Sequence, residues 1–264
     1  MATTITVLSQ KGGTGKTTTV RTLADVYRRI GLEVMCVDLD PQGNLSDYFD
    51  VPAEASPTMA DVLAGQARAA DALHEGLILP ANLGLAESEL VLSGKMGREL
   101  TLKRALRDVK RGFDLVLVDC PPSLGLLTVN ALVAADHALI SSEAEYFSLQ
   151  GVEQALEVVE LAKESLHPDL NWLGVVLNIA DMRLVHAREA DKQLRERFGD
   201  RVFKSVIRRS VRYAESAERG VSILDYGPDL GADYLALAAE ILERLGLAEE
   251  RERVSELRAE LVPA

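Results

Sequence analysis

The sequence predicts an α/β fold: a doubly wound, mostly parallel sheet with helices on both faces. Short runs rich in β-branched residues alternate with helix-like segments along the chain, which is the pattern of strands joined by crossover helices. The run FDLVLVD at 113–119 is almost wholly apolar, as expected of a strand buried on both faces. The first run leads through a glycine-rich loop into a helix-like segment, which is a typical β–loop–α unit.

The elements can be assigned in chain order from these patterns. Strands are expected at residues 4–9, 33–38, 77–80, 113–119, 137–142 and 172–178, with a weaker candidate at 204–207. Helices are expected near residues 16–30, 88–109, 125–134, 149–166, 186–198, 210–219 and 230–245. The region 50–76 is the most loop-like part of the chain.

The end of the chain, residues 246–264, is expected to form a helical tail. Leu247, Val254, Leu257 and Leu261 fall on one stripe at helical spacing, with charged residues elsewhere. We expect this stripe to dock on its own domain or on a second subunit. A membrane-binding helix would need an excess of Lys and Arg and bulky aromatic residues, whereas residues 249–260 carry five Glu and three Arg.

Length and composition indicate one large domain spanning residues 1–264. Hydrophobic residues make up 47% of the chain and the mean hydropathy is +0.05, which is enough to build a large core. No apolar run approaches the roughly 18 residues of a membrane span, and the N-terminus has no pattern of a secretory leader. Cys36 and Cys120 lack a CxxC partner, so we expect two reduced thiols in core strands of a cytoplasmic protein.

The stretch GGTGKTT, residues 12–18, predicts a phosphate-binding loop. Glycines let backbone N–H groups approach a phosphate closely, and the helix that begins near Lys16 adds its positive N-terminal dipole. Lys16 is expected to hold the β- and γ-phosphates and the Thr17 hydroxyl to coordinate Mg²⁺. The residues assigned to the nucleotide are Gly12, Gly13, Thr14, Gly15, Lys16, Thr17 and Thr18.

Three aspartates follow predicted strands at the edge where an α/β sheet binds ligand. Asp119 ends the strand in LVLVDCPPS and is expected to position Mg²⁺. Asp38 and Asp40 in VDLDPQGN are expected to point to different sides of the strand end, so that one can face the γ-phosphate and orient a water. Carboxylates repel a nucleotide unless a metal lies between them, so Mg²⁺ is expected near Thr17, Asp40 and Asp119.

Together, KGGTGKTT, VDLDPQGN and LVLVDCPPS resemble the deviant Walker ATPases of the ParA/Soj and MinD group, in their usual order. SEAEYFSLQGV (142–152) and VRYAESAERGVSI (211–223) are similar to the ParA/Soj branch. The resemblance spans about residues 3–245. It implies a slow ATPase that a partner protein accelerates.

The resemblance also implies a role for Lys11, the second lysine of the glycine loop. In this family that lysine reaches across a homodimer interface to the phosphates held by the other subunit. The two bound nucleotides would otherwise repel each other, so a lysine from each side makes the dimer ATP-dependent. The alternative is that Lys11 is a solvated surface charge.

Further roles follow from the same resemblance. Asp40 is similar to the residue that positions the attacking water, residues 38–46 to a first nucleotide-sensing switch, and residues 119–125 to a second. Asn178, Ile207 and Arg208 match the adenine-contacting region, although Arg208 replaces the more common proline. Thr14 replaces the more common valine, and we expect its side chain to face solvent. NIAD at 178–181 lacks the lysine of a guanine-reading NKxD motif, which favours ATP over GTP.

A basic stretch suggests where DNA would bind. Residues 181–220 hold eleven Lys or Arg and seven Asp or Glu, although the whole chain has a net charge of −12. Concentrated positive charge binds phosphate backbone without reading sequence. By the resemblance, Arg183 and Arg212 match DNA-contacting positions; Lys204 and Arg209 are supporting candidates. The alternative is a set of solvated charges with no ligand.

The predicted function is therefore a chromosome or plasmid partition ATPase. An ATP-bound homodimer would sit on nucleoid DNA until a ParB-type centromere-binding protein triggers hydrolysis. A MinD-like ATPase that cycles on membrane shares the nucleotide motifs and is the alternative. A reductase of the nitrogenase iron-protein type would need cysteine pairs at a dimer axis, and Cys36 and Cys120 are poorly placed for that.

Overall fold

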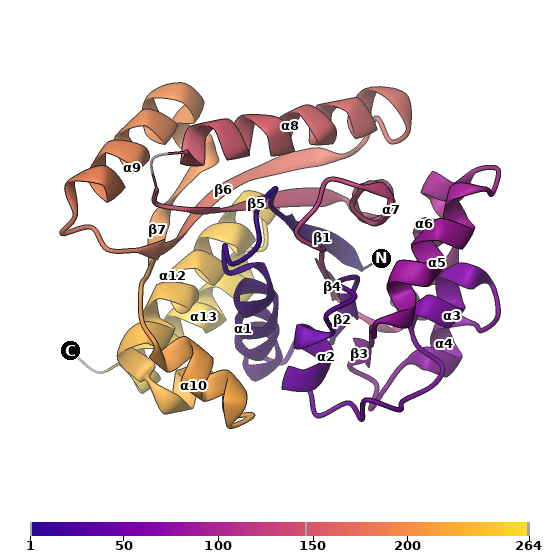
Figure 1. Ribbon diagram of the computed structural model, residues 1–264. Coiled ribbons are helices and arrows are strands. Elements are labelled where there is room, and N and C mark those ends of the chain that lie inside the picture. Colours follow the sequence, from indigo (N-terminus) through magenta and orange to yellow (C-terminus); the bar gives the residue numbers. More distant parts are fainter. Residues whose placement is uncertain (1, 146, 263–264) are drawn as a thin grey trace.

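A computed structural model describes residues 2–145 and 147–262. Its centre is a sheet of seven strands, all parallel, in the order β3-β2-β4-β1-β5-β6-β7 (Figure 1). The strands are β1 (Thr3–Leu8), β2 (Val34–Asp38), β3 (Ile78–Leu79), β4 (Leu115–Asp119), β5 (His137–Glu143), β6 (Asn171–Ala180) and β7 (Val202–Arg208). The predicted fold class and all seven predicted strands are confirmed.

The order of the strands brings the candidate site residues together. β1 lies between β4 and β5, and β2 pairs with the other side of β4. In that register Asp38 is the partner of Asp119, and Val7 is the partner of Asp119 on the opposite side. The carboxyl ends of β1, β2 and β4 therefore meet at one edge, where an α/β sheet binds its ligand.

One face of the sheet is covered by helices from the two ends of the chain (Figure 1). These are α1 (Lys16–Arg29), α10 (Arg212–Glu218), α11 (Ile223–Tyr226), α12 (Pro228–Leu245) and α13 (Ala248–Leu261), with the short α2 (Asn44–Tyr48) beside them. In α13, Val254 is fully buried, while Leu257, Leu261 and the preceding Leu247 pack partly buried against the same core. The apolar stripe of the tail therefore docks on its own chain.

The other face is covered by helices from the middle of the chain. They are α3 (Met59–Ala64), α4 (Ala69–Ala72), α5 (Gly84–Ser93), α6 (Thr101–Val109), α7 (Leu126–Ala134), α8 (Ser148–Ser165) and α9 (Val185–Phe198). Short 3₁₀ turns span Arg98–Leu100, Lys110–Gly112 and Gly199–Arg201.

One prediction of local structure was wrong, and another was incomplete. The segment 88–109 is not one helix, because α5 ends at Ser93 and Gly97 adopts a left-handed conformation (φ +65°) before α6 begins. The segment 50–76 is not all loop, because Thr58 and Asp61 form a capping box that starts α3.

The two edges of the sheet are protected in different ways. β3 has two residues and offers little edge. At β7, the Glu240 carboxylate of α12 accepts the backbone N–H groups of Lys204 (2.8 Å) and Ser205 (2.7 Å). Two backbone donors of this edge strand are therefore already satisfied and cannot pair with a further strand.

Both cysteines are buried and unpaired, as predicted. Cys120 follows β4 and its thiol lies 3.1 Å from the Thr6 hydroxyl; burial raises the pKa of Cys120 to about 12. Within residues 2–145 and 147–262, no helix is both long enough and apolar enough to span a bilayer.

Candidate nucleotide site

The glycine loop turns sharply between β1 and α1 because two of its glycines have left-handed backbone (Gly13 φ +79°, Gly15 φ +80°). It lines a cavity of about 370 Å³ formed by residues 12–18 together with Asp40, Gln42, Asn44, Pro122 and Ile179. We call this the phosphate cavity. Lys16 begins α1 and is buried (6% exposed), with its Nζ donating to the Lys11 carbonyl at 3.3 Å. The N–H groups of this loop and of the first turn of α1 are suited to binding an anion.

A buried pair of carboxylates lies beneath the loop. The Thr17 hydroxyl donates to Asp119 Oδ2 at 2.6 Å, while Asp119 Oδ1 is buried without a hydrogen-bond partner among the described residues. Burial and the neighbouring Asp38 raise the pKa of Asp119 well above its ordinary value. Burial likewise raises the pKa of Asp38 to about 6, although it accepts hydrogen bonds from the Ser46 hydroxyl and two backbone N–H groups.

Asp40 has a different environment from Asp38, as expected, because β2 ends at Asp38 and Asp40 lies in the loop that follows. Asp40 lines the phosphate cavity and its Oδ1 accepts the Gln42 N–H at 3.0 Å. Asp38 instead accepts the N–H groups of Asp40 and Ser46 (3.0 Å each), which fixes the loop that carries Asp40. Of the two, Asp40 is placed to act on a ligand and Asp38 to hold the loop.

The donor set fits Mg²⁺ bound through a hydroxyl, water and phosphate oxygens. Asp119 offers an unpartnered buried oxygen beside the Thr17 hydroxyl, and Asp40 lines the same cavity. In the described ranges no group of three or more His, Cys, Asp or Glu side chains could hold a metal ion without other ligands. Thr17 and Asp119 would therefore hold the ion jointly with the bound phosphates.

Lys11 lies on the other side of the loop. It is exposed, and its Nζ lies 5.6 Å from the centre of the Phe147 ring. It does not line the phosphate cavity; it borders a small hollow with Gln10, Glu143 and Phe147. The two lysines of one loop thus point to different surroundings.

A second cavity, of about 380 Å³, adjoins the phosphate cavity and shares Gly15, Thr18 and Ile179 with it. We call it the base cavity. Its other lining residues are Arg21, Asn178, the segment 207–211, Tyr213, Ala214, Ala217 and Tyr234. Ile179, at the junction, has φ +53°, a strained value for a β-branched residue.

The predicted adenine-contacting residues all border the base cavity, in different roles. Ile207 is buried, and the amide of Asn178 donates to Thr19 Oγ1 (3.1 Å) and Ser141 Oγ (2.7 Å). The Arg208 guanidinium pairs with Asp233 on α12 at 2.9 Å. The residue thus borders the cavity while its charged group is held by α12.

The expectation that Thr14 faces solvent was wrong. Its side chain is 2% exposed, and its hydroxyl has no hydrogen-bond partner among the described residues. The cause is β5, because the Ser141 hydroxyl donates to the Thr14 carbonyl at 2.7 Å and holds the loop against the strand. Ser141 and Thr19 were missed from the sequence; a hydroxyl at the carboxyl end of an apolar strand is the signal that could have found Ser141.

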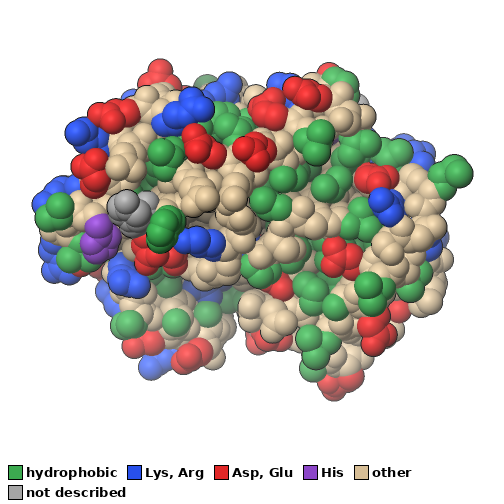
Figure 2. Space-filling model, turned by 45° about the horizontal axis from the view of Figure 1, so that its top comes forward, with side chains coloured by type: hydrophobic (Ala, Val, Ile, Leu, Met, Phe, Trp, Pro, Cys, Tyr) green, Lys and Arg blue, Asp and Glu red, His purple; other side chains and the backbone are tan. Residues whose placement is uncertain are grey.

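The four candidate DNA-contacting residues are not gathered in one place. Arg183, Arg209 and Arg212 follow the carboxyl ends of β6 and β7, whereas Lys204 lies in the first half of β7 and borders a separate hollow beside Glu240. Arg183 is exposed and pairs with Asp181 at 2.7 Å. Basic side chains gather at the left of the face in Figure 2, while hydrophobic ones are frequent over the right half.

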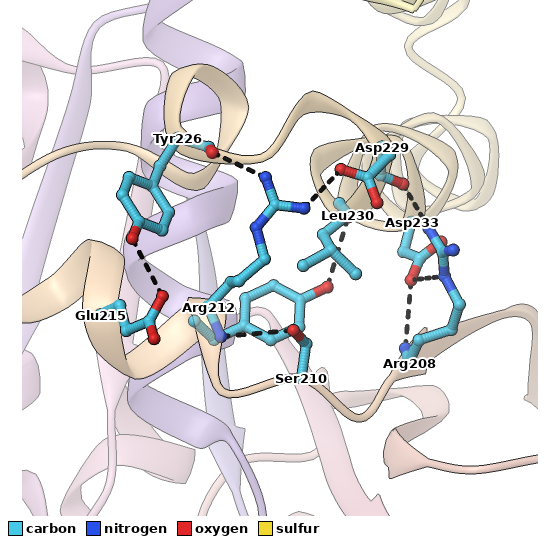
Figure 3. A network of polar contacts seen from close by, with 9 residues as sticks. Arg208, Ser210, Arg212, Glu215, Tyr226, Asp229, Leu230 and Asp233 are labelled. Carbon is cyan, nitrogen blue, oxygen red and sulfur yellow. Dashed lines mark hydrogen bonds and ion pairs between the residues drawn. The ribbon is translucent and has the colours of Figure 1, made fainter.

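Arg212 is held within the chain. Its Nη1 pairs with Asp229 at 2.9 Å and its Nη2 donates to the Tyr226 carbonyl at 2.8 Å (Figure 3). A Cβ at Gly227 would lie 2.8 Å from Arg212 Nη2, so the glycine makes room for the guanidinium. Arg209 is exposed beside it.

Comparisons with known proteins agree with this geometry. Residues 2–172 match the AAA domain family (AAA_31). The sporulation initiation inhibitor protein Soj of Bacillus subtilis is 40% identical over 245 residues, which cover 90% of this chain and 97% of Soj.

Solved structures share the fold. A Mycobacterium smegmatis structure titled cobyrinic acid a,c-diamide synthase, with bound ADP and magnesium, is 35% identical, with a TM-score of 0.75 over 83% of this chain and 93% of that chain. The septum site-determining protein MinD of Pyrococcus horikoshii, complexed with Mg-ADP, is 25% identical, with a TM-score of 0.76 over 94% and 98%. The chain belongs to the ParA/Soj family of P-loop ATPases, within the AAA domain family (AAA_31).

Proposed function

We propose that this protein is a partition ATPase that binds Mg²⁺-ATP, pairs face to face with a second copy, and holds DNA non-specifically until a ParB-type partner triggers hydrolysis. One observation carries the proposal: Lys16 is buried in the phosphate cavity, while Lys11 of the same loop is exposed outside it. One lysine serves the chain's own nucleotide, and the other is free to serve a neighbour's.

The chemistry is transfer of the γ-phosphoryl group to water, in which catalysis is mostly positioning and charge stabilisation. Lys16 and the N–H groups of residues 12–18 hold the phosphate oxygens. Asp40 orients the attacking water, with its loop fixed by Asp38. Thr17 and Asp119 hold Mg²⁺, which supplies positive charge to the phosphate oxygens. Lys11 of each subunit adds charge to the nucleotide of the other.

The base cavity receives the adenine between Asn178, Ile207 and the backbone around Arg208. It is bordered by apolar and aromatic side chains, which suit a planar base. Residues 38–46 and 119–125 both contribute to the phosphate cavity, through Asp40, Gln42, Asn44 and Pro122. They are thus placed to respond to the γ-phosphate as the two switches.

DNA binds along the carboxyl edge of β6 and β7, through Arg183, Arg209 and Arg212. Cations on exposed loops contact phosphates and give affinity that falls with salt. Pairing of two copies doubles this surface, so DNA binding depends on ATP. Lys204 lies in the first half of β7, away from this edge, and contributes through the overall electrostatic potential of the protein. The complex is nucleoid-associated in the cytoplasm.

The test is Lys11→Ala, compared with Lys103→Ala, which removes an exposed lysine from α6. We expect Lys11→Ala to bind ATP with near wild-type affinity but to stay monomeric in sedimentation with Mg²⁺-ATP, and to lose ATP-dependent DNA binding in native gels. Lys103→Ala should behave as wild type. An unchanged ATP-dependent dimer in Lys11→Ala would refute the assignment.

The alternative is a MinD-like ATPase that cycles on membrane, favoured by the structural similarity to MinD. Co-sedimentation with anionic lipid vesicles and with duplex DNA, each with ATP, separates the two. The docked α13, which buries Val254 against its own chain, favours DNA.

A further inference from the structure

Arg21 is a buried cation that the proposed mechanism does not use. It lies on α1, close after Lys16 and Thr17 in the same helix, and is 4% exposed. It lines the base cavity together with Tyr213 and Ile207. A guanidinium is costly to bury, so its presence beside a ligand cavity calls for a physical reason.

Its contacts join three elements. Arg21 Nη2 donates to the Tyr213 carbonyl at 2.6 Å and lies 3.3 Å from Ser216 Oγ, both on α10. Its guanidinium carbon lies 4.7 Å from the centre of the Tyr48 ring on α2. The Tyr48 hydroxyl in turn donates to Asp25 on α1 at 2.7 Å. α10, which walls the base cavity, is thus tied to the helix that begins the phosphate loop.

The electrostatics of this cluster are dominated by burial. Burial lowers the pKa of Arg21, and burial raises the pKa of Asp25, in spite of the attraction between them. Within the described residues, no carboxylate forms a direct ion pair with Arg21. Its hydrogen bonds go to the Tyr213 carbonyl and the Ser216 hydroxyl of α10. The charge of Arg21 therefore holds α10 against α1.

We propose that Arg21 is the positioning residue of the base cavity: it holds the first turn of α10 so that Tyr213 closes the cavity over a purine base. This inference rests on the proposed ATP-binding function. The inference distinguishes binding of the base from binding of the triphosphate, because Arg21 borders the base cavity and does not line the phosphate cavity. Base affinity depends on Arg21, and phosphate affinity does not.

The experiment compares Arg21→Met and Arg21→Lys with Arg29→Met. Arg29 lies on the same helix and pairs with Asp225 of α11, but does not line the cavity. Each protein is titrated, in the presence of Mg²⁺, with ATP and with inorganic tripolyphosphate, which lacks base and ribose. Thermal unfolding without ligand is measured for all variants.

We expect Arg21→Met to weaken ATP binding about tenfold, the loss of one charged hydrogen-bond anchor, while its tripolyphosphate affinity stays within about twofold. Arg21→Lys keeps the charge and should fall between Arg21→Met and wild type. Arg29→Met should bind both ligands as wild type does. If Arg21→Met does not fold, Arg21→Lys provides the test. It should lose more affinity for ATP than for tripolyphosphate.

Equal weakening of both ligands in the Arg21 variants, or unchanged ATP affinity, would overturn the inference. Neither result contradicts the proposed function, which Lys11→Ala and the binding of ATP by the wild type test. A wild-type protein that binds tripolyphosphate and gains nothing from the base would instead refute ATP as its nucleotide, and the inference with it.

Discussion

The phosphate cavity and the base cavity meet at Gly15, Thr18 and Ile179 and are built in opposite ways. Most of the residues that line the phosphate cavity come from one continuous segment, residues 12–18. The residues that line the base cavity are brought together from α1, β6, β7 and the segment after it, α10 and α12. A cavity formed mainly by one segment is encoded by a local motif. A cavity formed by several elements depends on how those elements pack.

The largest effect is expected at the phosphate cavity, from Lys16→Ala. Removing this buried amine should lower ATP turnover by a factor of about 100 or more, because its charge acts on the phosphates in a site shielded from water. Phosphate release at saturating Mg²⁺-ATP measures it. Arg21→Met is the comparison at the other cavity, and at saturation it should keep turnover within about twofold of wild type. Similar losses of ATP turnover in both variants would mean that the two cavities do not differ in their roles.

Gly15→Ala should damage both cavities at once. Gly15 has φ +80°, and a Cβ there would lie 3.2 Å from the Asn178 side chain. We expect ATP and tripolyphosphate to bind at least about tenfold more weakly, since strain of roughly 1–2 kcal/mol falls directly on the loop. Gly65→Ala is the control, because Gly65 has φ +81° with open space around it. Loss of ATP binding alone would place Gly15 in the base cavity only.

Asn178→Ala should show how much a residue of the base cavity contributes to the stability of the fold. Its amide donates to Thr19 and Ser141, and both hydroxyls would lose a buried partner. The free energy of unfolding should fall by about 2 kcal/mol, measured by urea denaturation. Asn171→Ala is a matched change at the other end of β6, where the amide meets His137 in a partly exposed position, and should cost less than about 1 kcal/mol. Equal costs would contradict the central role of Asn178.

The smallest effect is expected outside both cavities, at Asp229. This carboxylate pairs with Arg212 and competes with any phosphate for it. Asp229→Asn should tighten ATP-dependent DNA binding about two- to threefold and steepen its salt dependence. Asp225→Asn removes the same charge from a residue that pairs with Arg29 instead, and should change DNA affinity less. Weaker DNA binding by Asp229→Asn would mean that Arg212 serves the fold alone.

The phosphate cavity could be predicted from the sequence better than the base cavity. GGTGKTT and the aspartates after β2 and β4 were recognisable, because strand, loop and helix follow one another in the chain. Thr14 was misplaced, because its burial depends on Ser141 of β5, 127 residues away. Arg21 carried no signal at all, since its partners on α10 lie more than 190 residues along the chain.

The overall fold was easier to predict than its details. Strands β1, β2 and β4 are almost fully buried and rich in β-branched or aliphatic residues, so their composition identifies them. The break at Gly97 and the start of α3 at Thr58 depend on single turn and cap residues. Single turn and cap residues hardly change the periodicity of apolar residues, so a prediction from that periodicity misses them.

The Glu240 carboxylate at β7 has a consequence for higher-order assembly. An uncapped outer strand would let molecules join edge to edge into one continuous sheet, a contact that is stable and hard to reverse. With the N–H groups of Lys204 and Ser205 already occupied, these two groups cannot pair with the strand of another molecule. Contacts between copies at this edge would then depend on side chains more than on a shared sheet, and such contacts are easier to reverse.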